Sequence, residues 1–128
     1  MSPIVWHPGM NQAEHVLWQL QNRDIHDPDF RYFKSFSGRQ GLFVDVGANR
    51  GQSSVSVRMV WPECSIMAFE PTPNPEVRDA LSHLADVLED MTVHYTALGE
   101  RETEMVMITP VVDGIATLEQ GTLENPSR

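Results

Sequence analysis

The sequence predicts an α/β fold built on a parallel sheet, and two observations predict it. Short apolar runs typical of buried parallel strands recur at 42–46, 65–69 and 91–98. Stretches expected to be helical separate them, at 49–62 and 75–88. Strands and helices that alternate at this spacing are typical of a parallel sheet with helical crossovers.

A helical lead is predicted before the first strand. Residues 1–10 hold two prolines and show no periodicity, so we expect an arm. Asn11 is a favourable N-cap, and apolar residues recur at helical spacing over about 11–23. Asp27 followed by Pro28 marks a second helix start.

The stretch 49–62 carries conflicting signals. Its residues 54–60 alternate like a strand, and β-branched valines favour that structure locally. Two parallel strands, however, need a crossover of a dozen or more residues, usually helical. This stretch is the only candidate and Pro62 would end it, so we predict a helix.

The helix over 75–88 has clearer signals, with Asn74 as cap and Pro75 in the first turn. Beyond Gly99, residues 104–108 are predicted to form a further strand, in a hairpin. Three parts follow: an arm and helical lead (1–39), an α/β unit (40–108) and a loose tail (109–128).

Charge and cysteine content limit the function classes. The net charge is −9, and residues 41–128 hold 14 acids against 5 bases, so nucleic acid and anionic membranes are poor partners. Cys64 is the sole cysteine and cannot form an internal disulfide. Neither a transmembrane run nor a signal peptide is found in the sequence, and the predicted location is cytoplasmic.

The stretch Asp45-Val46-Gly47-Ala48-Asn49-Arg50-Gly51 lies where a strand turns into a helix. Glycines there allow a tight bend and close approach of a ligand. A dinucleotide fingerprint has its second glycine where Asn49 stands, and Asn49 together with a nearby carboxylate would disfavour a pyrophosphate. Asp45 suits an ammonium group and Asn49 a carboxylate, a pair that fits S-adenosylmethionine (SAM).

Glu70 ends the second predicted strand. An acid at this place can accept hydrogen bonds from both ribose hydroxyls of an adenosyl group. The predicted site therefore combines a loop for the charged amino-acid end of SAM with an acid for its ribose. No histidine pair has metal-ligand spacing, so no metal is expected, and no catalytic base can be named.

Three blocks of the sequence resemble the N-terminal half of FkbM-type SAM-dependent methyltransferases. They are FVDVGANRGQ (43–52), AFEPTPNP (68–75) and VHYTALGE (93–100). The resemblance implies a partial Rossmann-like methyltransferase fold and methyl transfer to a hydroxyl of a sugar or natural product.

The resemblance also implies roles for single residues. Asp45, Gly47, Asn49 and Gly51 would form the loop on the methionine side, and Glu70 would hold the ribose. Pro71 would shape the wall beside it, and Ala97 and Leu98 would lie near the adenine.

The chain departs from the family pattern after this half. Family members continue into further strands with a K-x-D-x-E-G-type block that has no counterpart here. The strand at 42–46 would then keep an open apolar edge. We therefore expect a fragment that is marginally stable, self-associates, or both.

Two alternatives stay open. A nicotinamide-dependent oxidoreductase fragment would share the strand, turn and ribose acid but lacks here the third spaced glycine of its fingerprint. A non-catalytic SAM-binding or assembly module would keep the loop without an acceptor site.

Overall fold

The computed structural model describes residues 3–99 and the backbone of short strands within 106–124. It confirms the α/β class and the parallel sheet. The sheet has the order β1-β2-β3, with all neighbours parallel. Its strands are β1 (Gly41–Val46), β2 (Cys64–Phe69) and β3 (Met91–His94).

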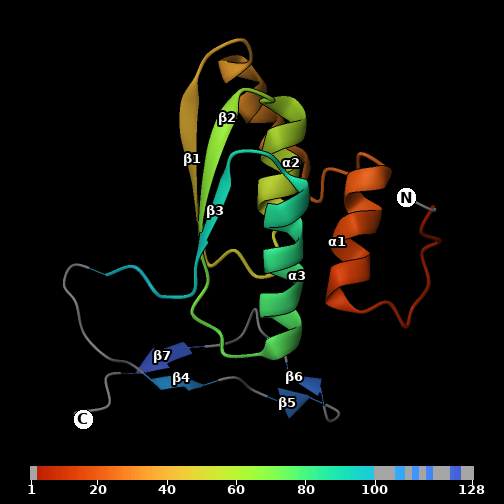
Figure 1. Ribbon diagram of the computed structural model, residues 1–128, viewed down its shortest axis with the longest axis vertical. Coiled ribbons are helices and arrows are strands. Elements are labelled where there is room, and N and C mark those ends of the chain that lie inside the picture. Colours follow the sequence, from red (N-terminus) through yellow and green to blue (C-terminus); the bar gives the residue numbers. More distant parts are fainter. Residues whose placement is uncertain (1–2, 100–105, 109–110, 113–114, 117–121, 125–128) are drawn as a thin grey trace.

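The helices cover one face of this sheet. They are α1 (Gln12–Gln21), the 3₁₀ helix η1 (Pro28–Phe36), α2 (Gln52–Val60) and α3 (Pro75–Val87). Figure 1 shows α2 and α3 beside the sheet, with α1 outside them, and α1 contacts both. Among the described residues, no helix combines the length and apolar character needed to cross a membrane.

The predicted capping residues begin their helices. The side chain of Asn11 accepts a hydrogen bond from the backbone N–H of Glu14, and that of Asn74 accepts from Glu76. Asp27 does the same for the N–H of Asp29 at the start of η1. Each cap satisfies an N–H that a helix leaves without an internal partner.

The stretch 49–62 is helical at α2, as its role as a crossover predicted. Its alternating pattern arises because consecutive residues of α2 are all buried: Ser54, Val55, Ser56 and Val57. The sheet, α1 and η1 all contact this helix, so it has no single apolar face. Burial on several sides therefore explains why its sequence is not amphipathic.

The third strand is shorter than the predicted 91–98, which was wrong beyond His94. Strand β2 ends at Phe69, whose register partner is His94, so β3 has no neighbour beyond that residue. Tyr95 turns instead onto α3, where its hydroxyl donates to the carbonyl of Arg78 at 3.1 Å. The pattern of apolar residues continues although the pairing does not.

Four short strands are described in the C-terminal part. They are β4 (Val106–Ile108), β5 (Val111–Val112), β6 (Ile115–Ala116) and β7 (Thr122–Glu124). β4 pairs antiparallel with β7, and β5 with β6. The predicted strand at 104–108 is thus described at 106–108, while 104–105 lie outside the described residues. Three of the strands lie within 109–128, the predicted tail.

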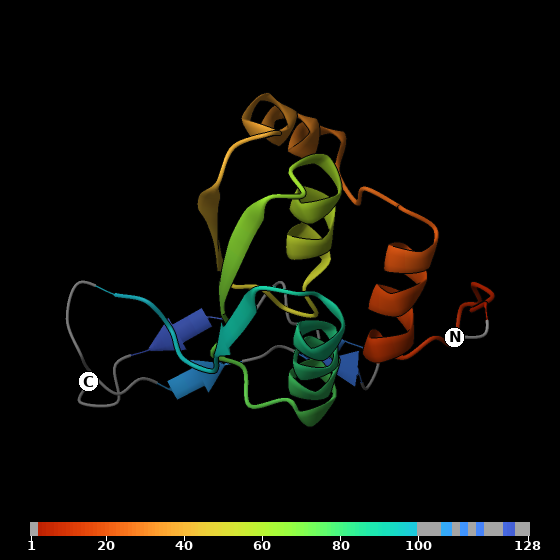
Figure 2. The same ribbon diagram turned by 45° about the horizontal axis from the view of Figure 1, so that its top comes forward.

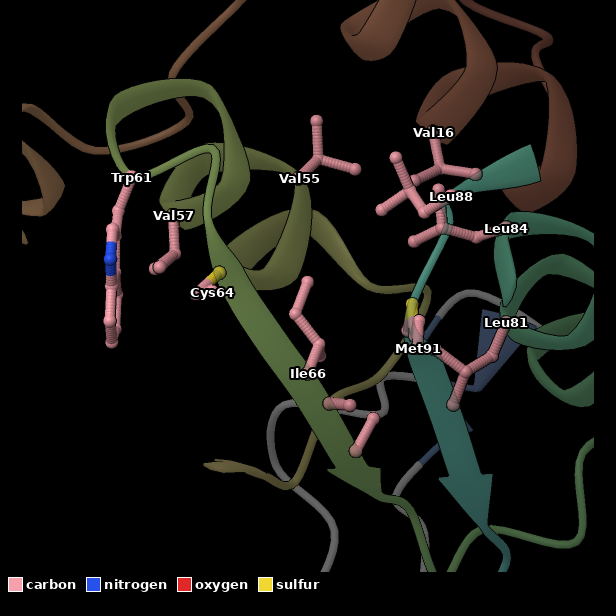
Figure 3. Packing of buried hydrophobic residues seen from close by; sticks show 12 residues of the cluster. Val16, Val55, Val57, Trp61, Cys64, Ile66, Leu81, Leu84, Leu88 and Met91 are labelled. Atoms are coloured by element: carbon pink, nitrogen blue, oxygen red, sulfur yellow. The ribbon is translucent and has the colours of Figure 1, made fainter. Parts of the chain in front are cut away.

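The core lies between the sheet and the helices. Figure 3 shows Val55 of α2, Ile66 of β2 and Leu81 of α3 among its buried side chains. Near the beginning of β1, Trp61 packs so closely on Gly41 that a Cβ at position 41 would lie 2.5 Å from the indole ring. The indole N–H donates to the carbonyl of Arg39 at 2.8 Å.

Among the described residues, no helix or strand lies over the opposite face of β1, as both views of the ribbon indicate (Figures 1 and 2). Leu42, Val44 and Val46 are 53%, 43% and 63% exposed. In the described sheet β1 is also an edge strand. The predicted open apolar edge is therefore present.

Candidate functional site

The loop between β1 and α2 lies at the carboxyl end of the strands. Gly47, Asn49 and Gly51 adopt left-handed backbone conformations, with φ values of 71°, 54° and 98°. The N–H groups of Gly47 and Ala48 both donate to the carbonyl of Phe69, at 2.9 and 3.0 Å. The loop is thereby fixed to the end of the neighbouring strand.

Both glycines of this loop have a positive φ, and Gly51 is required for a second reason as well. At Gly51 a Cβ would lie 2.3 Å from Cδ2 of Leu84, so the absence of a side chain lets α2 begin against α3. At Gly47 no heavy atom of the described residues beyond its chain neighbours lies within 4 Å of the Cβ position, and only the positive φ requires glycine. Open space therefore adjoins the loop at Gly47.

Glu70 joins this loop to the end of β2. Its Oε1 accepts a hydrogen bond from the N–H of Asn49 at 2.7 Å. Its Oε2 accepts another from the N–H of Thr72 at 2.8 Å. The side chain is 6% exposed, and its carboxylate holds the turns after both strands together.

Asp45 provides a second buried carboxylate at the end of β1. Its Oδ2 accepts a hydrogen bond from the hydroxyl of Ser54, in the first turn of α2, at 2.6 Å. Burial raises the pKa of Asp45, the hydrogen bonds from Ser54 oppose this, and the charge of Glu70 raises it further. The charge of Glu70 thus acts on Asp45 at one end of the sheet.

The structure brings most of the predicted site residues together. Asp45, the loop residues and Glu70 lie together at the carboxyl end of the sheet. Pro71 follows Glu70 directly and is half-buried. Ala97 and Leu98 belong to the segment 95–99 after β3, and Figure 1 shows that this segment leaves the sheet on the side away from α3. Leu98 is 50% exposed.

Thr72 was missed as a site residue. It is 2% exposed, its N–H donates to Glu70, and its carbonyl accepts from Nε of Arg78 at 2.9 Å. Arg78 thereby fixes the turn that presents Glu70. The sequence offers no signal for these contacts, because backbone groups make them.

Ser54 was also missed, although it carries a signal. Its hydroxyl lies in the first turn of α2, close to the end of β1. A serine or threonine placed there after a strand-ending acid can donate to that acid.

In the described part of the chain, no group of three His, Cys, Asp or Glu side chains could hold a metal ion.

Comparison with protein-family models, curated proteins and solved structures found no match for this chain. The features that bear on function are the geometry at the carboxyl end of the sheet and the three motif blocks. The arrangement offers two buried carboxylates, a loop with left-handed turns and open space beside Gly47.

Proposed function

We propose that this chain is the cofactor-binding half of a SAM-dependent methyltransferase with a partial Rossmann-like fold. Its acceptor would be a small molecule with a hydroxyl group. The contact between Glu70 and the N–H of Asn49 carries the proposal, because it unites the acid and the loop.

The loop and Glu70 lie at the carboxyl end of the sheet, and this position supports a ligand site. In open α/β sheets, ligands bind in the crevice beyond the carboxyl ends of the strands. The loop after β1 and the acid after β2 lie there together. The left-handed Gly47 leaves room beside the loop where a side chain would otherwise project.

The charges at this edge support a cationic ligand over a pyrophosphate. Burial and the neighbouring Glu70 both disfavour the charged form of Asp45 and raise its pKa. A bound ammonium or sulfonium group would stabilise both carboxylates, whereas a pyrophosphate would add repulsion. This observation disfavours a nicotinamide dinucleotide and favours SAM.

The residues fit the groups of SAM by their chemistry. A carboxylate oxygen that accepts one hydrogen bond can accept a second, so Glu70 can hold the ribose hydroxyls while it retains both backbone bonds. Asp45 would take the ammonium group, and Asn49 with the loop N–H groups the carboxylate. Pro71 would border the ribose, with Ala97 and Leu98 toward the adenine.

When bound, SAM supplies an electrophilic methyl group on its sulfonium. The contribution of this chain would be to bind and orient the methyl donor. Positioning of this kind accounts for about 7–11 kcal/mol of the barrier in well-oriented reactions.

Calorimetry with SAM and with NAD tests the proposal. We expect saturable binding of SAM and none of NAD at the same concentration. Glu70→Ala should weaken SAM by about ten- to a hundredfold, as expected for the loss of one or two charged hydrogen bonds. Glu89→Ala is the matched control, because Glu89 is an exposed acid after α3.

Loss of binding in Glu70→Ala could also reflect a disturbed loop, so the ligand is varied as well. A SAM analogue without ribose hydroxyls should bind the native chain more weakly than SAM. The Glu70→Ala variant should not distinguish the two ligands. If the native chain also binds both equally, Glu70 does not hold the ribose.

Turnover is measured separately, with hydroxylated sugars as acceptors and S-adenosylhomocysteine as the product followed. Methyl transfer to an acceptor would support the proposed methyltransferase activity. Binding of SAM without turnover would instead support the module that binds SAM without catalysis. Absence of SAM binding would contradict both.

A further inference from the structure

A hollow of about 440 Å³ lies at the other end of the molecule. It is bordered by the connection from α1 to η1, by η1 and by the end of α2. Helix α2 runs from the carboxyl end of β1 back to the beginning of β2, so its last residues lie at the amino ends of the strands (Figure 1). The hollow is therefore separate from the loop and Glu70.

Basic side chains gather around this hollow. Arg23, Arg31 and Lys34 line it together with Ser37. They account for three of the chain's nine basic residues, in a protein whose net charge is −9. Among the described residues, no carboxylate lies within ion-pair distance of these three cations.

The rest of the lining is apolar. Ile25, Met59, Val60 and Pro62 border the hollow, and the first three are half-buried. The volume lies within the range of pockets that bind small molecules. The hollow thus combines a cationic rim with an apolar wall.

We propose that this hollow binds a small organic phosphate, with its phosphate on the cations and its apolar part against Met59 and Val60. Guanidinium groups match phosphate oxygens with paired hydrogen bonds, and Lys34 adds a point charge. The hydroxyl of Ser37 can donate a further hydrogen bond. An apolar body would cover the wall that water now contacts.

The overall charge favours a small ligand over a polymer. A nucleic acid or anionic membrane would meet the acidic remainder of the surface, whereas a small phosphate meets the lining of the hollow, which holds three cations and no acid among the described residues. The proposal goes beyond the proposed methyltransferase function. Each can fail without the other, because the two sites lie at opposite ends of the sheet.

Calorimetry with phenyl phosphate and inorganic phosphate tests the proposal. We expect saturable binding of phenyl phosphate, and weaker binding of inorganic phosphate, which cannot contact the wall. The double variant Arg31→Gln/Lys34→Gln should weaken phenyl phosphate by at least about tenfold, as expected for two lost charged contacts. Arg39→Gln is the matched control, since Arg39 is exposed in the same segment but does not line the hollow.

Methyl NMR of methionine-labelled native protein locates the ligand without any charge variant. The resonance of Met59, assigned with Met59→Leu, should move on addition of phenyl phosphate. The proposal is overturned if neither phosphate binds, if only other methionines respond, or if both phosphates bind equally. Equal losses in Arg39→Gln and the double variant would also overturn it.

Discussion

The carboxylate of Glu70 accepts a hydrogen bond of 2.7 Å from the backbone N–H of Asn49, which links the ends of two neighbouring strands. The other oxygen of Glu70 accepts from Thr72. One side chain therefore fixes the turns that follow β1 and β2.

Glu70→Gln should destabilise the fold because an amide has only one oxygen. Its NH₂ group would face one of the two backbone N–H donors, which would be left buried without an acceptor. We expect the free energy of unfolding to fall by about 1–3 kcal/mol, measured by urea denaturation. Glu89→Gln should leave it unchanged, and equal stability of both variants would show that these hydrogen bonds contribute little.

Asp45→Asn should stabilise the fold at neutral pH. Since burial raises the pKa of Asp45, the folded state binds this proton more tightly than the unfolded state. The free energy of unfolding therefore falls as the pH rises from the ordinary pKa of an aspartate, about 4, through the raised pKa of Asp45 in the folded state. Asparagine carries no charge and can still accept from Ser54, so we expect a gain of about 1 kcal/mol at pH 7.

The same variant should lose its advantage as the pH falls toward about 4, where Asp45 itself becomes protonated. Urea denaturation at several pH values measures the difference, with the exposed Asp86→Asn as control. A variant less stable than the native chain at pH 7 would contradict a net cost of the buried charge.

The glycines of the loop should differ in their sensitivity to alanine. Gly47→Ala is expected to cost about 1–2 kcal/mol, the strain of a left-handed residue with a side chain. Gly51→Ala should cost about 1–3 kcal/mol more, because its methyl group would overlap Leu84. Gly9→Ala is the control, and equal losses at positions 47 and 51 would show that Leu84 moves aside freely.

Val44→Lys should reduce self-association. Val44 is 43% exposed on the uncovered face of the edge strand β1, and a lysine there opposes pairing with another chain. Sedimentation should show concentration-dependent association of the native chain and a smaller species for the variant. Val87→Lys, on α3, places the same charge elsewhere, and a native chain that stays monomeric would refute the prediction.

The sequence predicted those elements that local signals or connectivity determine. Asn11 and Asn74 marked helix starts, and the need for a crossover identified α2 despite its strand-like valines. The end of β3 could not be predicted, because it depends on where β2 ends and on the contact of Tyr95 with α3. Pattern within one segment carries no information about the length of its neighbour.

The candidate site was predictable in its outline but not in its internal contacts. Asp45, Asn49 and Glu70 follow from their places at strand ends, since parallel strands bring those ends to one edge. The partner Ser54 carries a sequence signal that the prediction did not use, whereas the contact of Thr72 depends on a backbone group that no motif encodes. The basic hollow was not predicted either, because Arg23 and Lys34 come from separate segments of the chain.

The alternation of left-handed residues at 47, 49 and 51 means that backbone chirality, more than side-chain chemistry, defines this loop. A D-amino acid prefers positive φ values as strongly as its L-form avoids them. Chemical synthesis of the chain with D-alanine at position 47 should therefore keep the native bend while it restricts the unfolded chain. D-alanine at position 47 should therefore avoid the loss of stability that L-alanine causes there.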